Sequence, residues 1–166
     1  AVRGYQGDGE TIGKDHVYAC MKHYIAYGAC IGGRDYNTAD LSLQTLYDVY
    51  LPPFKAGIDA GAATVMSAFE DVNGVPATGN RYLLTDVLRD QLGFKGFVVS
   101  DAGAVTELVP HGFAEDIKEA VRLAFGAGCD MIMAGDPYNE YLPALIEEGR
   151  ITMEQVDRSV LAVLTL

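Results

Sequence analysis

Hydrophobic residues gather in four short runs along the chain, each bounded by glycine, proline or polar residues. The runs occupy residues 17–21, 63–69, 96–100 and 130–134. None alternates strictly between apolar and polar positions, which is typical of strands buried on both faces, as in a parallel sheet. Their midpoints are spaced by 45, 33 and 33 residues, which leaves room for a crossover helix between consecutive parallel strands.

The segments that follow these runs carry apolar residues at helical spacing. A helix capped by Ser42 is expected to end near residues 52–53, and a helix capped by Asn80 is expected to end at Gly93. Three further helices are expected. The first ends at residues 126–128, the second ends at Gly149, and the third begins with the capping box at 152–155. The chain therefore reads as strand then helix four times, followed by one extra helix.

This alternation predicts the α/β class, with parallel β/α units in one domain. Both a doubly wound sheet and a (β/α)₈ barrel are built from such units. A complete barrel needs about 250 residues and eight strands, whereas this chain has 166 residues and four expected strands. The pattern is thus that of a small open sheet or of about half of a barrel.

The amino-acid composition argues against several classes of binding partner. The 12 basic and 23 acidic residues give a net charge of −11, and no basic cluster suits a phosphate backbone, so we expect no nucleic-acid partner. No apolar stretch reaches the roughly 18 residues of a membrane span. Three cysteines without CxxC spacing favour neither a disulfide framework nor a zinc site, and we expect no metal and no cofactor.

Candidate chemistry lies where strands end, because ligands of parallel α/β folds bind beyond the carboxyl ends of the strands. Asp101 follows the third run and precedes Ala102 and Gly103, so a substrate can approach its carboxylate closely. Such a carboxylate can act as a nucleophile or a base. The structural alternative is a helix N-cap.

Four other positions lie at the ends of the first two runs. Lys22 and His23 can hold sugar hydroxyls or keep a nearby carboxylate ionised, but an ion pair of purely structural role is an alternative. Lys22 alone could instead form a Schiff base, as in a lyase. Phe69 is either a core residue or an aromatic floor for a sugar ring, and Glu70 is ambiguous. His111 and His16 fall in expected loops and are interpreted as surface residues.

Six stretches together resemble glycoside hydrolase family 3, in particular its bacterial β-glucosidases. The resemblance covers nearly the whole chain in order. The stretches are MKHYIAYG at 21–28, GGRDYNT at 32–38, LPPFKAG at 51–57, NGVPA at 73–77, LLTDVLRD at 83–90 and GFKGFVVSD at 93–101.

The resemblance implies an enzyme that hydrolyses terminal non-reducing β-D-glycosyl residues, in particular glucosyl, from oligosaccharides or β-glucosides. By resemblance, Asp101 is the nucleophile of a retaining mechanism, and Lys22 and His23 hydrogen-bond the sugar in the −1 subsite. Phe69 falls where relatives carry an aromatic residue beside that sugar. Ala102 departs from the tryptophan that is frequent after the nucleophile. The stretch directly after the lysine–histidine pair, residues 24–30, offers no second histidine, which favours a glucosidase or xylosidase over a β-N-acetylglucosaminidase.

The resemblance also implies that residues 1–166 are part of a barrel domain, about strands five to eight, with no second domain. The acid/base glutamate of relatives comes from a separate domain, so we expect a fragment of a longer enzyme that is weak or inactive alone. Open strand edges are association-prone, which implies either a homo-oligomer or contact with the remainder of the enzyme. A periplasmic or secreted location is typical of relatives. The alternative function is a non-catalytic sugar-binding or structural remnant.

Overall fold

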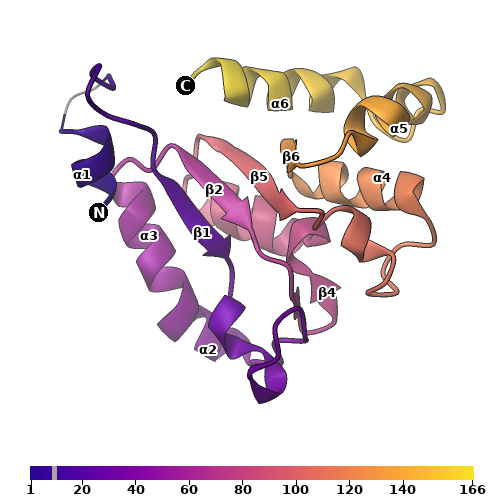
Figure 1. Ribbon diagram of the computed structural model, residues 1–166, viewed down its shortest axis with the longest axis horizontal. Coiled ribbons are helices and arrows are strands. Elements are labelled where there is room, and N and C mark those ends of the chain that lie inside the picture. Colours follow the sequence, from indigo (N-terminus) through magenta and orange to yellow (C-terminus); the bar gives the residue numbers. More distant parts are fainter. Residues whose placement is uncertain (9–10) are drawn as a thin grey trace.

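A computed structural model describes residues 1–8 and 11–166, and four parallel strands form its main sheet (Figure 1). The spatial order is β1–β2–β5–β6, which is also the order along the chain. The predicted α/β class with parallel β/α units is confirmed. The strands are β1 (Cys20–Tyr24), β2 (Thr64–Ser67), β5 (Phe97–Ala102) and β6 (Met131–Met133).

Sequential strand order distinguishes between the two architectures that the sequence left open. A doubly wound sheet reverses its strand order at a switch point, and no reversal occurs among these four strands. Crossovers between parallel strands are right-handed in nearly all proteins, so a sequential order keeps every crossover helix on the same face. This is the winding of a barrel, with half of its eight strands.

Helices and one small hairpin connect the strands. The hairpin pairs β3 (Asp71–Val72) with β4 (Val75–Pro76). The longer helical segments are α1 (Val2–Gln6), α2 (Leu43–Thr45), η3 (Leu46–Tyr50), α3 (Leu51–Asp59), η5 (Tyr82–Gln91), α4 (Ile117–Ala127), α5 (Pro137–Glu147) and α6 (Met153–Leu164). Single turns form η1 (Tyr27–Ala29), η2 (Ile31–Gly33), η4 (Ala77–Gly79) and η6 (Thr106–Leu108). Within the described part of the chain, no helix has the length and apolar character that a membrane crossing requires.

The predicted helix starts are confirmed by their hydrogen bonds. Ser42 Oγ accepts from the Thr45 amide at 3.0 Å, and Asn80 Oδ1 accepts from the Leu83 amide at 3.1 Å. The capping box of Thr152 with Gln155 is also present. Each cap satisfies an amide that has no partner inside its own helix.

Two predicted boundaries are wrong. The helix that Ser42 opens does not end near residues 52–53, because α3 continues to Asp59 and takes the two prolines into its first turn. The prolines follow η3, a π-helical segment that interrupts the regular α-helical bonding before them. The first strand is Cys20–Tyr24 rather than 17–21, so it includes Lys22 and His23. Its register is set by pairing with β2, which the local pattern does not contain.

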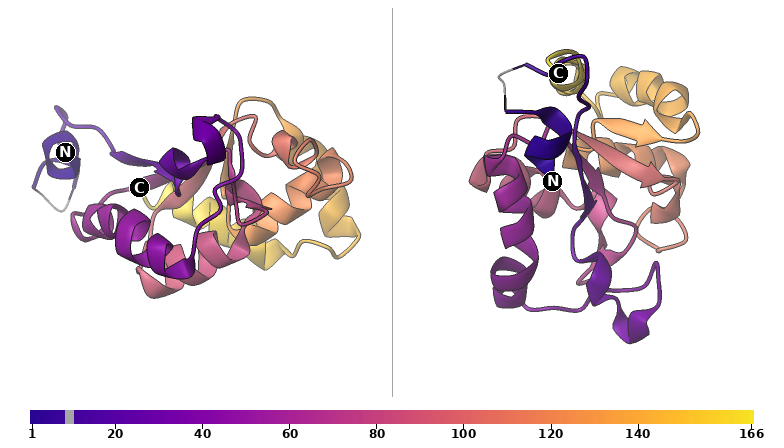
Figure 2. Two further views of the ribbon diagram at one scale, coloured as in Figure 1. Left: turned by 90° about the horizontal axis from the view of Figure 1, so that it is seen from below. Right: turned by 60° about the vertical axis from the view of Figure 1, so that its left-hand side comes forward.

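The amino-terminal end of the sheet is held by a buried carboxylate, that of Asp130, whose side chain is 1% exposed. Its oxygens accept from the Val98 amide and from Ser159 Oγ, both at 2.8 Å, and from the Arg89 guanidinium. Ser159 belongs to α6, which crosses this end of the sheet (Figures 1 and 2). Asp130 therefore ties β5, η5 and α6 together at the end opposite to the expected chemistry.

Candidate active site

Asp101 and His23 meet at the carboxyl-terminal end of the sheet. His23 Nε2 lies 3.2 Å from Asp101 Oδ2, and the two side chains are 24% and 14% exposed. His23 comes from β1 and Asp101 from β5, so they reach toward each other from either side of β2. The other carboxylate oxygen, Oδ1, accepts from the Ala102 amide at 2.7 Å. One backbone donor and the His23 ring therefore flank the carboxylate, which still reaches the surface.

Both strands that carry this pair depart from regular pairing at the site. The register of β1 on β2 shifts between Met21 and Tyr24, and that of β5 on β6 shifts between Val99 and Ala102. Irregularities of this kind re-aim side chains and are common beside active sites. Asp101 itself lies in β5, within this irregular part, rather than at a helix N-cap.

Lys22 lies in the same strand as His23, β1, but does not contact Asp101. Its side chain is exposed beside His23, and no ion pair joins it to Asp101 among the described residues. His23 therefore contacts the carboxylate, whereas the Lys22 side chain is exposed to solvent.

Phe69 lies just beyond the end of β2 and is covered by an aromatic residue that sequence reasoning missed. Its ring centroid is 4.5 Å from that of Tyr36, with the planes tilted by 50°. Phe69 is 9% exposed and Tyr36 is 48% exposed, so the aromatic surface that solvent reaches is mainly that of Tyr36. Tyr36 belongs to a loop without apolar periodicity, and only the quoted stretch at 32–38 hinted at its importance.

A second missed aromatic residue supports the histidine. The Tyr27 ring lies 4.7 Å from the His23 ring, centroid to centroid. The phenol is protonated at neutral pH, as tyrosines ordinarily are, and a hydrogen bond to Asp35 raises the pKa of Tyr27 further. Tyr27 therefore presents an uncharged ring to His23.

Glu70, which the sequence left ambiguous, is fully buried. Neither of its carboxylate oxygens has a hydrogen-bond partner among the described residues. Burial raises its pKa to about 7, and the charges of Asp35 and Asp71 act in the same direction. An uncompensated buried charge is costly, so Glu70 is favoured in its protonated form over most of the acidic range.

This raised pKa gives a prediction for stability against pH. Between pH 4.5 and about 7, unfolding releases the Glu70 proton, so the free energy of unfolding falls as the pH rises, by about 2 kcal/mol in total after allowance for screening. In Glu70→Gln this contribution is absent. Urea unfolding across this range is expected to show a shallower decline for the variant.

The control for this prediction is Glu154→Gln, at an exposed position in the first turn of α6. It should leave the pH dependence of unfolding as it is in the parent chain. If Glu70→Gln and the parent chain lose stability in parallel between pH 4.5 and 7, the side chain does not titrate as inferred.

A cavity of about 330 Å³ lies on the Tyr36 side of the site. It is lined by Tyr36, Glu107, Pro110 and His111. Burial raises the pKa of Glu107, the charge of His111 opposes this shift and the charge of Asp101 adds to it. His111, interpreted from sequence as a surface residue, therefore lines this hollow together with Glu107.

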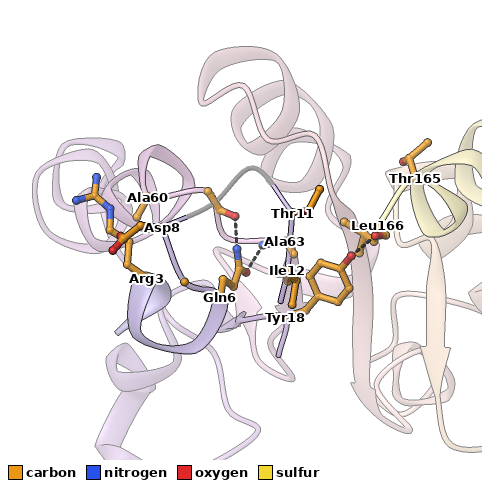
Figure 3. Close-up of a pocket in the computed structure, with 12 residues that line it drawn as sticks. Arg3, Gln6, Asp8, Thr11, Ile12, Tyr18, Ala60, Ala63, Thr165 and Leu166 are labelled. Atoms are coloured by element: carbon orange, nitrogen blue, oxygen red, sulfur yellow. Dashed lines mark hydrogen bonds between the residues drawn. The ribbon is translucent and has the colours of Figure 1, made fainter. Parts of the chain in front are cut away.

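A larger cavity, of about 800 Å³, lies at the opposite end of the sheet (Figure 3). There the Gln6 side chain donates to the Gly61 carbonyl at 2.8 Å and accepts from the amides of Ala19 and Ala63. The Tyr18 hydroxyl bonds the Leu166 carbonyl across the hollow. In barrel folds this end of the sheet contributes to stability rather than to catalysis. The hydrogen bonds of Gln6 accordingly link its helix, α1, to the backbone at Ala19, Gly61 and Ala63.

Known proteins resemble this chain along nearly all of its length. The family model "Glycosyl hydrolase family 3 N terminal domain" matches residues 1–166. A periplasmic β-glucosidase of Salmonella typhimurium is 51% identical over 150 residues, which are 90% of this chain and 20% of that protein. A putative β-xylosidase of Formosa agariphila is 37% identical over 99% of this chain and 22% of its own length. The chain thus spans about a fifth of these relatives.

Solved structures give the same result. The β-glucosidase from Listeria innocua superposes with a TM-score of 0.94 at 44% identity, covering 99% of this chain and 23% of that one. Its complex with isofagomine gives a TM-score of 0.96, and a mutant of it has been solved with laminaribiose. A family model along the whole chain, together with relatives above 30% identity, shows that the chain belongs to glycosyl hydrolase family 3.

Proposed function

We propose that this chain is the nucleophile-bearing part of a retaining exo-β-glycosidase that removes terminal non-reducing β-D-glucosyl residues. Residues 1–166 would then form about strands five to eight of its catalytic barrel. The observation that carries the proposal is the 3.2 Å contact of His23 Nε2 with Asp101 Oδ2 at the carboxyl end of the sheet. A glucoside substrate is favoured by the β-glucosidase relatives from Salmonella and Listeria.

In the proposed mechanism, Asp101 attacks the anomeric carbon and the bond from that carbon to the leaving oxygen breaks. The leaving oxygen takes a proton from an acid, and a covalent glycosyl ester on Asp101 remains. Water then cleaves this ester and restores the carboxylate. His23 orients Asp101 and, together with Lys22, binds hydroxyls of the sugar, while Phe69 and its cover Tyr36 form the apolar side of the subsite.

The acid is proposed to come from outside residues 1–166. Retention requires two carboxyl groups about 5–5.5 Å apart, and Glu70, which is fully buried, cannot approach a substrate. The outer edges of β1 and β6 would meet the remaining strands of the barrel or a second copy of the chain. A periplasmic location is proposed from the Salmonella relative.

A graft and a trapping reagent test this proposal. The segment of the Listeria β-glucosidase that matches this chain is replaced by residues 1–166, so that any nucleophile in that segment is supplied by this chain. The graft is treated with 2-deoxy-2-fluoro-β-D-glucosyl fluoride, whose glycosyl–enzyme ester forms but turns over slowly. Peptide mass spectrometry is expected to find the sugar on Asp101.

The alternative, a non-catalytic sugar-binding remnant, gives a different result in the same experiment. A graft that folds and binds glucose but carries no label would support the remnant. A label on another side chain would remove Asp101 from the proposed role. The unmodified Listeria enzyme serves as the positive control for labelling.

A further inference from the structure

We infer that Tyr27 is a positioning residue, whose ring holds the His23 imidazole in the orientation in which it meets Asp101. The inference rests on the proposed function and extends it by a residue that acts on the site through the histidine. Tyr27 lies four positions after His23, in the single turn η1 that follows β1.

The His23 ring is held from two directions. Its Nε2 edge lies 3.2 Å from Asp101 Oδ2, and the Tyr27 ring lies 4.7 Å from it, centroid to centroid, with the planes tilted by 32°. This distance is within the range that aromatic pairs favour. The torsion that turns an imidazole about its own bond has broad minima, so the orientation of the ring depends on its neighbours. Tyr27 limits this rotation, and the ring edge stays directed at Asp101.

The backbone before Tyr27 is shaped for this contact. Ala26 adopts a φ of +70°, in the left-handed region that alanine rarely occupies, and it is buried. The Ala29 amide donates to the Ala26 carbonyl at 2.8 Å and closes the turn. Such conformations persist where the surrounding structure imposes them, and they are frequent at functional sites. The turn at Ala26 reverses the chain after β1, so the Tyr27 side chain returns to the histidine.

The loop that follows holds Tyr27 at its other end. The Tyr27 hydroxyl is hydrogen-bonded to Asp35. The loop that carries Asp35 is closed by the Ile31 amide, which donates to the Thr38 carbonyl at 2.9 Å. Thr38 Oγ1 in turn donates to Asp71 Oδ2 at 2.7 Å, which ties the loop to the β3–β4 hairpin. Tyr27 is thus fixed between this loop and His23.

The position of His23 matters for the proposed reaction, because His23 contacts the attacking carboxylate and is proposed to bind a sugar hydroxyl. A displacement of about 1 Å in a catalytic site can cost about 100-fold in rate. A residue that acts by positioning His23 has this effect only while His23 is present. A residue that only packs the loop acts equally with or without His23.

A double-mutant cycle in the grafted enzyme separates these two roles. Tyr27→Leu and His23→Ala are introduced singly and together, and kcat/KM is measured with dinitrophenyl β-D-glucoside. Tyr27→Leu alone is expected to lower kcat/KM by about 10- to 100-fold. In the His23→Ala graft, Tyr27→Leu is expected to change kcat/KM by less than about twofold, because the residue through which it acts is gone.

A milder variant and a control accompany the cycle. Tyr27→Phe keeps the ring and its packing but loses the hydrogen bond to Asp35. It is expected to lower kcat/KM by about threefold when His23 is present and to have no effect in the His23→Ala graft. Tyr5→Leu, which removes a tyrosine ring that is 59% exposed on α1, is the matched control and should leave kcat/KM as it is.

An effect of equal size in the presence and absence of His23, zero included, would overturn the inference. Circular dichroism checks that each variant is folded, and Tyr27→Phe decides the question if Tyr27→Leu is not. The proposed function is decided separately, by labelling of Asp101 in the unsubstituted graft. A labelled Asp101 together with uncoupled Tyr27 and His23 would therefore refute the positioning role and leave the nucleophile in place.

Discussion

Asp101→Asn in the grafted enzyme is expected to lower kcat/KM for aryl β-glucosides by about 10⁴-fold or more. The amide keeps the size of the side chain and its place beside His23, but it carries no charge to attack the anomeric carbon. Activated leaving groups lose as much as poor ones, because the first covalent step is removed for both. Steady-state kinetics with nitrophenyl glucosides measures the loss.

Replacing Asp101 by glycine gives a more specific test of its role as nucleophile. In Asp101→Gly, added azide can enter the vacated space and attack the same face of the sugar, which yields an α-glucosyl azide and restores turnover. Asp136→Asn is the matched control, because Asp136 also follows a strand, β6, but is exposed and bonds Asn139 at the start of α5. If Asp101→Gly shows no azide product, or if Asp136→Asn loses as much activity, the role of Asp101 is disproved.

The second large effect concerns folding rather than chemistry. Asp130→Ala is expected to lower the free energy of unfolding by about 3–5 kcal/mol. The substitution leaves the Arg89 guanidinium without its carboxylate, and the Val98 amide and Ser159 hydroxyl without their acceptor. Urea unfolding followed by circular dichroism measures the change.

A surface pair provides the comparison for Asp130. Lys55 and Asp59 form an ion pair one turn apart on α3, with both side chains about half-exposed. Asp59→Ala should cost less than about 1 kcal/mol, as is usual for exposed pairs. Similar losses for the two variants would mean that burial does not distinguish the two carboxylates.

The sequence predicted those features that depend on neighbouring residues. The caps at Ser42 and Asn80 and the glycine stops follow from hydrogen bonds and φ angles within a few residues. Such signals need no knowledge of the rest of the fold.

Features set by distant partners were not predictable in this way. The bounds of β1 depend on its pairing with β2, and Tyr36 reaches Phe69 from a loop 33 positions away in sequence. The full burial of Glu70 is likewise decided by the tertiary packing around it. His23 and Asp101 were each marked by their strands, but their contact across β2 depends on register shifts that only the folded sheet reveals.

The sheet uses two aspartates at its opposite ends in opposite ways. Asp130 accepts from a backbone amide, a hydroxyl and a guanidinium, and its side chain is buried, so it holds the fold together and does not face a substrate. Asp101 has fewer donors and an open approach. Substitutions in the loop after β5 can therefore change the substrate preference without removing the hydrogen bonds of Asp130 that stabilise the fold. This makes residues 102–116 a natural target for directed evolution of glycoside preference.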